Sequence, residues 1–370
     1  MLNKISKSLL LVAFSLLMVF FSAVSYAQEK QGNEPVEAKK EAAKFDPAKL
    51  IMEHIMDAHE FHFFSVGDFH AKIPLPVIVY NQAKGVSVFS YAKLEEGAVY
   101  DGYKSEEGKI VAVDADGKID ETAKVIDISL TRNVVQMILS LTLLVVLMIG
   151  IANKYKKNGS MVAPSGWQNA IEPVITFVRD EVGKPNLGHK YEKYMPYLLT
   201  VFFFILINNI VGLIPGTANV TGNIAFTMVL AVISFVVIML STNSHFWGHI
   251  FWPPGMPIFV KVILIPVELL SVLLIKPASL MIRLFANMVA GHIIITCFIM
   301  LIFIFGAMSP VAGWGFSPVS IAFTVFIYFI EILVAFLQAF IFTTLTALFI
   351  GQSFEGEHGE HELNGEEVHI

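Results

Sequence analysis

The chain has 370 residues, of which 55% are hydrophobic and only 15% are charged, and its mean hydropathy is +0.66. No soluble core needs this much apolar area, so the composition excludes a wholly soluble protein and predicts a polytopic membrane protein. The net charge of −6 distinguishes little, because acidic and basic residues occupy different segments. The single cysteine, Cys297, excludes an internal disulfide, and its place in an apolar run indicates a packing role.

Residues 1–27, "MLNKISKSLLLVAFSLLMVFFSAVSYA", have the order of features found in a secretory signal peptide. Lys4 and Lys7 make a basic start, an apolar stretch follows over Leu9–Phe21, and "SYA" supplies a small-x-small cleavage site. We therefore predict a signal that is removed from the mature protein. An uncleaved membrane anchor is the alternative, and under either interpretation the following chain starts outside the cytoplasm.

A small α+β extracytoplasmic module is predicted over 28–130, and it begins with a charged linker at 28–48. The stretch "AKLIMEHIMDAHEFHFF" (48–64) has apolar residues at helical spacing and predicts a helix. Three stretches rich in β-branched and aromatic residues predict strands, and the last includes an Asp116-Gly117 hairpin turn. These stretches are "IPLPVIVYN" (73–81), "GVSVFSYAKL" (85–94) and "GKIVAVDADGKID" (108–120).

Apolar runs then predict membrane-crossing helices. Between the first and second crossing, the segment 154–193 is rich in lysine, which places it in the cytoplasm by the positive-inside rule and agrees with a translocated N-terminal module. Within it, "GWQNAIEPVITFVRDEVG" (166–183) predicts a helix that either lies flat at the membrane surface or is a solvated connector. The first three crossings are predicted over 131–153, 194–214 and 224–242.

Two further apolar runs, 258–307 and 316–352, are too long for upright crossings. Fifty helical residues extend roughly 75 Å, whereas the hydrocarbon core is roughly 30 Å thick. The sequence permits two steeply tilted helices or extra crossings. We predict an all-α membrane domain over 131–352 with about five crossing helices, the last two long and strongly tilted. An exposed acidic cytoplasmic tail follows over 353–370.

Charged residues are rare in this membrane domain, and each one costs about 2.5–3.5 kcal/mol at the centre of a bilayer. Five lie between residues 194 and 353: Lys261, Glu268, Lys276, Arg283 and Glu331. The first three can be interfacial, with side chains that reach toward water. Arg283 and Glu331 lie deep within apolar runs, and such residues mark ion pathways or proton relays by default.

Helical geometry sorts the polar neighbours of these charges into two faces. Lys276, Ser279, Arg283 and Asn287 share one face of their helix, Glu331 and Gln338 share one face of the last helix, and His292 points to the side opposite Arg283. Each has a plainer interpretation. Arg283 and Glu331 can be a structural ion pair, His292 an interhelical hydrogen-bonding group, and Lys276 an interfacial anchor. Asn287 and Gln338 can join helices by hydrogen bonds.

Two segments in this domain resemble subunit a of the rotary F-type ATP synthase. They are "KPASLMIRLFANMVAGH" (276–292) and "EILVAFLQAFIFTTLTALFI" (331–350), and "NNIVGLIPGTANVTGN" (208–223) is also similar to its counterpart in that family. The resemblance implies a non-catalytic stator subunit whose last two helices lie tilted against a ring of c subunits. Two aqueous half-channels in such a subunit carry protons to and from the ring carboxylates and couple ion flow to rotation.

The resemblance also implies roles for individual residues. Arg283 matches the essential arginine between the half-channels, Gln338 the glutamine that faces it, and Asn287 a polar position near it. His292 and Glu331 match a titratable pair whose two residue types are exchanged here, which suggests that they meet in the extracytoplasmic half-channel. Weaker candidates for channel lining are Lys276, Ser279, Asn219, Asn223 and Glu268, the last standing one residue farther from Arg283 than the family's acidic position.

The partners implied are the c-subunit ring, subunit b of the peripheral stalk, other ATP synthase subunits and the lipid bilayer, with no nucleic acid and no cofactor. The location implied is the inner membrane of a bacterium. A self-contained secondary transporter is the main alternative, but the internal repeats typical of one are not evident. An intramembrane metalloenzyme is a second alternative, and it would need clustered ligands such as HExxH.

Three other patterns invite a metal interpretation, and in each a simpler one is preferred. The histidines of 53–62 lie near acids but do not follow HExxH, so a solvated helix is expected there. "DADGKID" (114–120) lacks ligands of a calcium loop and is expected to be a turn. The tail histidines stand among acids in what is expected to be a solvated tail. The histidines concerned are His54, His59, His62, His358, His361 and His369.

Overall fold

In a computed structural model of the chain, the structure describes residues 57–66, 69–82, 84–106, 108–114, 119–120, 123, 125–159, 166–214, 216–251 and 257–354. The predicted signal, linker and acidic tail, the Asp116-Gly117 turn, and the histidines at 54, 358, 361 and 369 lie outside these residues. The chain forms two compact units, which are described separately. One contains Met239–Pro277 together with 352–354, and the other contains the remaining described residues.

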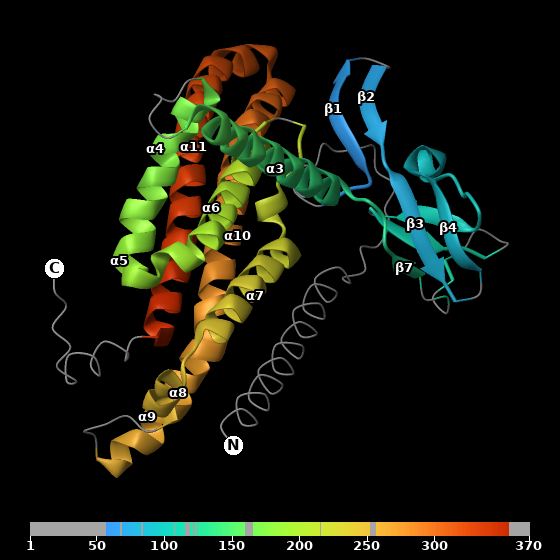
Figure 1. The fold of residues 1–370 in the computed structure, drawn as a ribbon. Coiled ribbons are helices and arrows are strands. Elements are labelled where there is room, and N and C mark those ends of the chain that lie inside the picture. Colours follow the sequence, from blue (N-terminus) through green and yellow to red (C-terminus); the bar gives the residue numbers. More distant parts are fainter. Residues whose placement is uncertain are drawn as a thin grey trace. The chain divides into compact units, whose positions relative to one another are not determined.

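The N-terminal module is built from short antiparallel strands (Figure 1). Its three sheets are β1–β2, β4–β3–β7 and β5–β6, and a 3-10 turn, η1, follows β4. The bounds are β1 Glu60–Val66, β2 Phe69–Pro74, β3 Pro76–Asn81, β4 Gly85–Ser90, η1 Tyr91–Gly97, β5 Tyr103–Glu106, β6 Lys109–Ala112 and β7 Val125–Asp127. The strand prediction for 73–81 is therefore confirmed over most of its length, and those for 85–94 and 108–120 are confirmed in their first parts. The prediction is wrong for Tyr91–Leu94, which begin the 3-10 turn η1.

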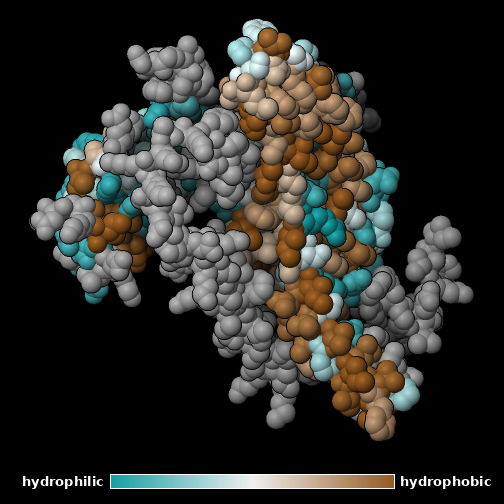
Figure 2. All heavy atoms as spheres, turned by 180° about the vertical axis from the view of Figure 1, so that it is seen from behind, coloured by the Kyte–Doolittle hydropathy of each residue, from teal (hydrophilic) through white to brown (hydrophobic). Residues whose placement is uncertain are grey.

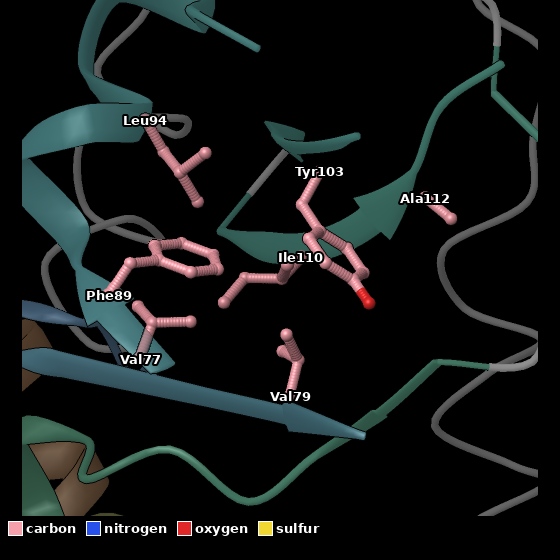
Figure 3. Packing of buried hydrophobic residues seen from close by; sticks show 7 residues of the cluster. All are labelled: Val77, Val79, Phe89, Leu94, Tyr103, Ile110 and Ala112. Atoms are coloured by element: carbon pink, nitrogen blue, oxygen red, sulfur yellow. The ribbon is translucent and has the colours of Figure 1, made fainter. Parts of the chain in front are cut away.

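A small apolar core holds this module together. Side chains alternate along β3, so Val77 and Val79 are fully buried, while Tyr80 on the other face is 40% exposed. Figure 3 shows Phe89 from β4, Leu94 from η1 and the β5–β6 residues pointing toward the same space. The cluster consists of Val77, Val79, Phe89, Leu94, Tyr103, Ile110 and Ala112.

The helix predicted over 48–64 is wrong for its last part, because Glu60–Val66 is strand β1. Phe61 pairs with Ile73, and Glu60 with Pro74, in an antiparallel ladder with β2. A short apolar stretch fits helical and strand periods almost equally well, so the partner strand decides between them. His59 is 5% exposed, so the expectation of a solvated helix is wrong for this histidine as well.

Five helical stretches in the described residues are long and apolar enough to cross a membrane, which confirms the predicted fold class. The first is α3, Arg132–Asn158, and the third is α7, Ile224–Ser241. The second consists of α4 Trp167–Phe177, η2 Val178–Gly183, α5 Lys184–Leu187, η3 Gly188–Lys190 and α6 Tyr191–Gly212. A short turn, η4 Val220–Gly222, precedes α7.

The predicted helix over 166–183 forms, and it is not a solvated connector. The ring of Phe177 lies 5.9 Å from Phe336 and 5.3 Å from Phe340, both on the last helix. Val178 and Val182 are fully buried. One side of this helix is therefore fixed against the membrane domain, and its predicted position at the membrane surface stays a prediction.

The two long apolar runs are each continuously helical. The first contains α9 Ile258–Leu270, η5 Ser271–Ile275 and α10 Lys276–Met308, and the second is a single helix, α11 Pro310–Phe354. A shorter helix, α8 Ser244–Phe251, precedes them. The wide π-helical turn η5 ends two residues before Pro277, which has no N–H to donate to the regular helical ladder. The interpretation with extra crossings is wrong, and the strong tilt stays a prediction.

Helices α10 and α11 run side by side in opposite directions (Figure 1). The rings of Phe298 and Phe323 stack at 5.3 Å, and those of Phe305 and Phe316 lie 4.5 Å apart nearer the connecting turn. At Gly313 a Cβ would come within 2.7 Å of the Cα of Gly306, so the backbones approach closely there. Figure 2 shows apolar residues over most of the helix surface in that view.

Candidate ion path on α10 and α11

Glu331 occupies the most informative position in the membrane domain. It lies in the middle of α11, and it is 5% exposed. A Cβ built at Gly291 on α10 would overlap the Glu331 carboxyl group. Because Gly291 has no side chain, the Glu331 carboxyl can occupy the space beside it. His292 is the next residue after Gly291 on α10.

The carboxyl of Glu331 retains an open position. Among the described residues, its buried Oε2 has no hydrogen-bond partner. Buried polar atoms are nearly always satisfied, and an exception at a titratable group is typical of a functional site. The structure thus places the Glu331 carboxyl at Gly291, and the meeting of Glu331 with His292 itself stays a prediction.

One turn beyond Arg283 on α10, a hydrogen bond joins the two long helices. The Asn287 amide donates from Nδ2 to Oε1 of Gln338 over 2.7 Å. Gln338 is 1% exposed, whereas Asn287 is exposed. The structure thus joins Asn287 and Gln338 across the two helices, and the prediction that Gln338 faces Arg283 stays a prediction.

Arg283 is half-buried on the same side of α10 as Asn287. Among the described residues it forms no ion pair, so the plainer interpretation of Arg283 and Glu331 as a structural pair is wrong. A guanidinium keeps its proton under all physiological conditions. The residue therefore contributes a fixed positive charge beside the Asn287–Gln338 pair.

The loop before α7 reaches the same region of α10. Asn219 donates from Nδ2 to the backbone carbonyl of Met288 over 3.3 Å. Asn223 instead accepts at Oδ1 from the backbone N–H of Ala225 over 2.9 Å, which caps the start of α7. Of the two weaker candidates on this loop, only Asn219 is thus brought to α10 by a hydrogen bond.

Sequence reasoning missed two contacts of this site. Asn209 on α6 donates to the carbonyl of Ala335 over 3.2 Å, one turn beyond Glu331 on α11. The close approach at Gly291 was also missed, although a glycine next to a histidine inside an apolar helix is a usable signal for such an approach. The stretch 208–223 was noticed for its resemblance alone.

The chain is similar to known proteins over most of its length. The family "ATP synthase A chain" matches residues 134–351. An ATP synthase subunit a from Chloroherpeton thalassium is 39% identical over 330 residues, which cover 88% of this chain and 81% of the relative. A subunit a from Prosthecochloris aestuarii is 45% identical over 241 residues, covering 63% and 72% of the two chains.

The chain belongs to the ATP synthase subunit a family. It is a multi-pass membrane protein, and it is the proton-translocating, non-catalytic stator subunit of the membrane sector of a bacterial ATP synthase. This result excludes the self-contained transporter and the metalloenzyme. Residues 50–128 match a separate domain of unknown function, DUF8433, which covers most of the predicted module.

In the compact unit that contains Met239–Pro277 and 352–354, Lys276 donates from Nζ to Oε1 of Gln352 over 2.9 Å. Glu268 lies close enough for its charge to interact with that of Lys276. Gln352 is a further residue that sequence reasoning missed. Lys276 is therefore hydrogen-bonded near the end of α11, and Ser279 lies one turn further along α10.

In the module, the buried His59 pairs with the partly exposed Asp127, with 2.9 Å between Nε2 and Oδ2. Burial alone would raise the pKa of Asp127, but hydrogen bonds from His59 and Ser129 outweigh it and hold the pKa below its usual value. Among the described residues, no group of three His, Cys, Asp or Glu side chains could hold a metal ion. The pair therefore links the start of β1 to β7.

Proposed function

We propose that Glu331 and His292 form the proton-transfer groups of the extracytoplasmic inlet half-channel, and that Arg283 separates this half-channel from the outlet. The observation that carries the proposal is the Glu331 carboxyl seated on Gly291, beside His292 in the chain. Two titratable groups on neighbouring helices can pass a proton between water and a rotor carboxylate. The open Oε2 of Glu331 suits a group that takes up and releases protons.

Arg283 acts by charge. A cation close to a carboxylate lowers the pKa of that carboxylate and favours its ionised form. A c-subunit carboxylate that passes Arg283 is therefore kept deprotonated, and the fixed charge repels protons that would otherwise leak between the half-channels. A proton that crosses 100 mV releases about 2.3 kcal/mol, and a leak would waste this free energy.

Asn287 and Gln338 hold the two long helices in register beside the arginine. Their 2.7 Å hydrogen bond links α10 and α11 one turn from Arg283. Ser279 and Lys276 continue the same face toward the outlet, with Glu268 acting on Lys276 through its charge. Asn219 lines the inlet at the Met288 turn, and Asn223 supports the loop by capping α7.

The partners are the c-subunit ring, which supplies the carboxylates, and subunit b of the peripheral stalk, which holds the stator still. The module over 28–130 lies outside the cytoplasm, behind a signal at 1–27, and the 131–352 domain spans the inner membrane. The lysine-rich segment 154–193 and the acidic tail 353–370 then face the cytoplasm. The family match over 134–351 and the separate match over 50–128 support this division.

The proposal is tested by replacing Arg283 in the assembled enzyme. In inverted membrane vesicles, Arg283→Ala should lower ATP-driven proton pumping to background, at least about a hundredfold. Arg283→Lys should also lose most pumping, because a lysine in an apolar site can release its proton.

Arg179→Ala is the matched control, since Arg179 pairs with Asp180 on the surface at 2.9 Å and should be dispensable. Copurification of the other subunits shows that each variant complex has assembled. Normal pumping by an assembled Arg283→Ala enzyme would overturn the proposal.

A further inference from the structure

A buried glutamine on α3 holds the loop that reaches the ion path. Gln136 is 4% exposed and lies in the second turn of α3. Its Nε2 donates to the carbonyl of Ala218 over 2.5 Å, and its Oε1 accepts from the Ala218 N–H over 2.7 Å. The side-chain amide therefore pairs with both backbone groups of one loop residue, which fixes the position and the orientation of that residue.

Asn219, the next residue after Ala218, connects the loop to α10 by a hydrogen bond. Asn219 accepts at Oδ1 from the N–H of Gly222 over 3.0 Å, and it donates from Nδ2 to the carbonyl of Met288 over 3.3 Å. In an α-helix the carbonyl of Met288 is also the acceptor for the N–H of His292. The loop thus contacts α10 at the turn that contains Gly291 and His292.

The loop has little room to shift. A Cβ at Gly222 would come within 2.7 Å of the Asn219 amide, and one at Gly212 on α6 would touch the Ala218 carbonyl at 3.4 Å. Ala218 itself is fully buried. Because the loop is closely packed on α6, the orientation of Asn219 depends on how the Ala218 peptide is held, and Gln136 holds it from a second helix.

We propose that Gln136 is a positioning residue of the inlet half-channel. By fixing the Ala218 peptide it directs Asn219 onto Met288, and so it keeps the Gly291–His292 turn of α10 aligned with the Glu331 carboxyl. This inference rests on the proposed function, in which Glu331 and His292 transfer protons. It assigns a role in ion translocation to the first membrane helix, through a side chain that does not itself contact the titratable groups.

The test uses assembled membrane sectors in vesicles from which the catalytic sector has been removed, with passive proton flux measured over a range of pH. Gln136→Met keeps the length of the side chain but removes both hydrogen bonds. It should lower the flux about fivefold or more, and it should shift the pH of half-maximal flux, because the surroundings of Glu331 and His292 change. Asn219→Ala should do the same, and the double variant should be little worse than either, since both break one chain of contacts.

Ser140→Ala is the control on the same helix. Ser140 is fully buried one turn beyond Gln136, and within the described part of the chain its Oγ has no partner, so flux and pH profile should stay unchanged.

Glu331→Gln distinguishes a failure of the inference about Gln136 from a failure of the proposed function. If Glu331→Gln abolishes flux while assembled Gln136→Met has a normal flux and pH profile, the inference about Gln136 is overturned and the proposed function stands. If Glu331→Gln conducts normally, the proposed function itself is overturned. Strictly additive losses in the Gln136→Met, Asn219→Ala double variant would also contradict the inference.

Discussion

The N-terminal module and the membrane domain both bury apolar side chains, but they differ in their surfaces and in the polar groups that they bury. In the module, apolar side chains such as Val77 and Phe89 form the core. In the membrane domain, polar side chains such as Gln136, Asn208 and Gln338 are buried beside apolar ones, while large apolar residues such as Leu240 and Phe329 are 72% and 70% exposed. The solvent accounts for the difference, because lipid accepts apolar surface that water rejects and offers no hydrogen bonds to polar groups.

The buried polar groups of the membrane domain show where to look for function. Some are satisfied locally: Thr343 and Thr346, for example, donate to carbonyls four residues earlier. Glu331 Oε2 is one of several buried atoms without a partner among the described residues, and it belongs to a titratable group in the middle of α11. In the module, both carboxylate oxygens of Asp127 have partners instead, one with His59 Nε2 and one with the N–H of Ser129, which suits a structural role.

The largest effect is expected when the space beside Gly291, which the Glu331 carboxyl occupies, is filled. Gly291→Ala places a methyl group where the Glu331 carboxyl lies, and it should displace that carboxyl from the His292 turn. Overpacking a buried site costs about 1–3 kcal/mol, so passive proton flux through the membrane sector should fall about tenfold.

Gly306→Ala is the matched control, because it lies on the same helix and its Cβ would have no atom within 4 Å. Flux in this variant should remain near that of the unmodified chain. If the two glycine variants conducted equally well, the contact between Gly291 and Glu331 would have no part in the ion path.

A change at the His59–Asp127 pair of the module should have a smaller effect, and it should alter the stability of the module alone. The pKa of Asp127 is lowered in the folded state, so its contribution to stability is present above the ordinary value of 3.8 and is lost as the pH falls through the folded-state pKa. Asp127→Asn should destabilise the module by about 1 kcal/mol near neutral pH, a modest value because the carboxylate is partly exposed. The loss should shrink as the pH falls below 3.8 and the carboxylate becomes protonated.

This effect is measured by unfolding the solubilised chain in urea at several pH values, with hydrogen exchange of the β3 amides as the readout. Proton flux should be unchanged in Asp127→Asn. A loss of flux in assembled complexes would break the comparison, since it would couple the module to the ion path.

The membrane domain was largely predictable from sequence, for a physical reason. An apolar run of about 20 residues must be a helix in lipid whatever its neighbours are, so α3, α6, α7 and the two long runs needed no tertiary information. Helical period alone likewise placed Arg283 with Asn287 and Glu331 with Gln338. Their individual roles remain predictions.

Contacts between distant segments were not predictable. Nothing in the local sequence shows that Gln136 would meet Ala218, or that Gly291 would receive the Glu331 carboxyl. The strand β1 was misassigned for the same reason, because its partner β2 decides its conformation. Close approaches and strand pairs depend on which distant segments meet in the fold. No local pattern in a single sequence indicates which segments these are.

The most direct test of the account is the proton flux carried by Glu331→Gln. In vesicles stripped of the catalytic sector and driven by a potassium diffusion potential, this variant should conduct at least about tenfold less than the unmodified chain. Glu192→Gln, which changes an exposed glutamate at the start of α6, should conduct normally. Equal flux in both variants, with the complexes assembled, would contradict the claim that the buried carboxyl on α11 carries protons.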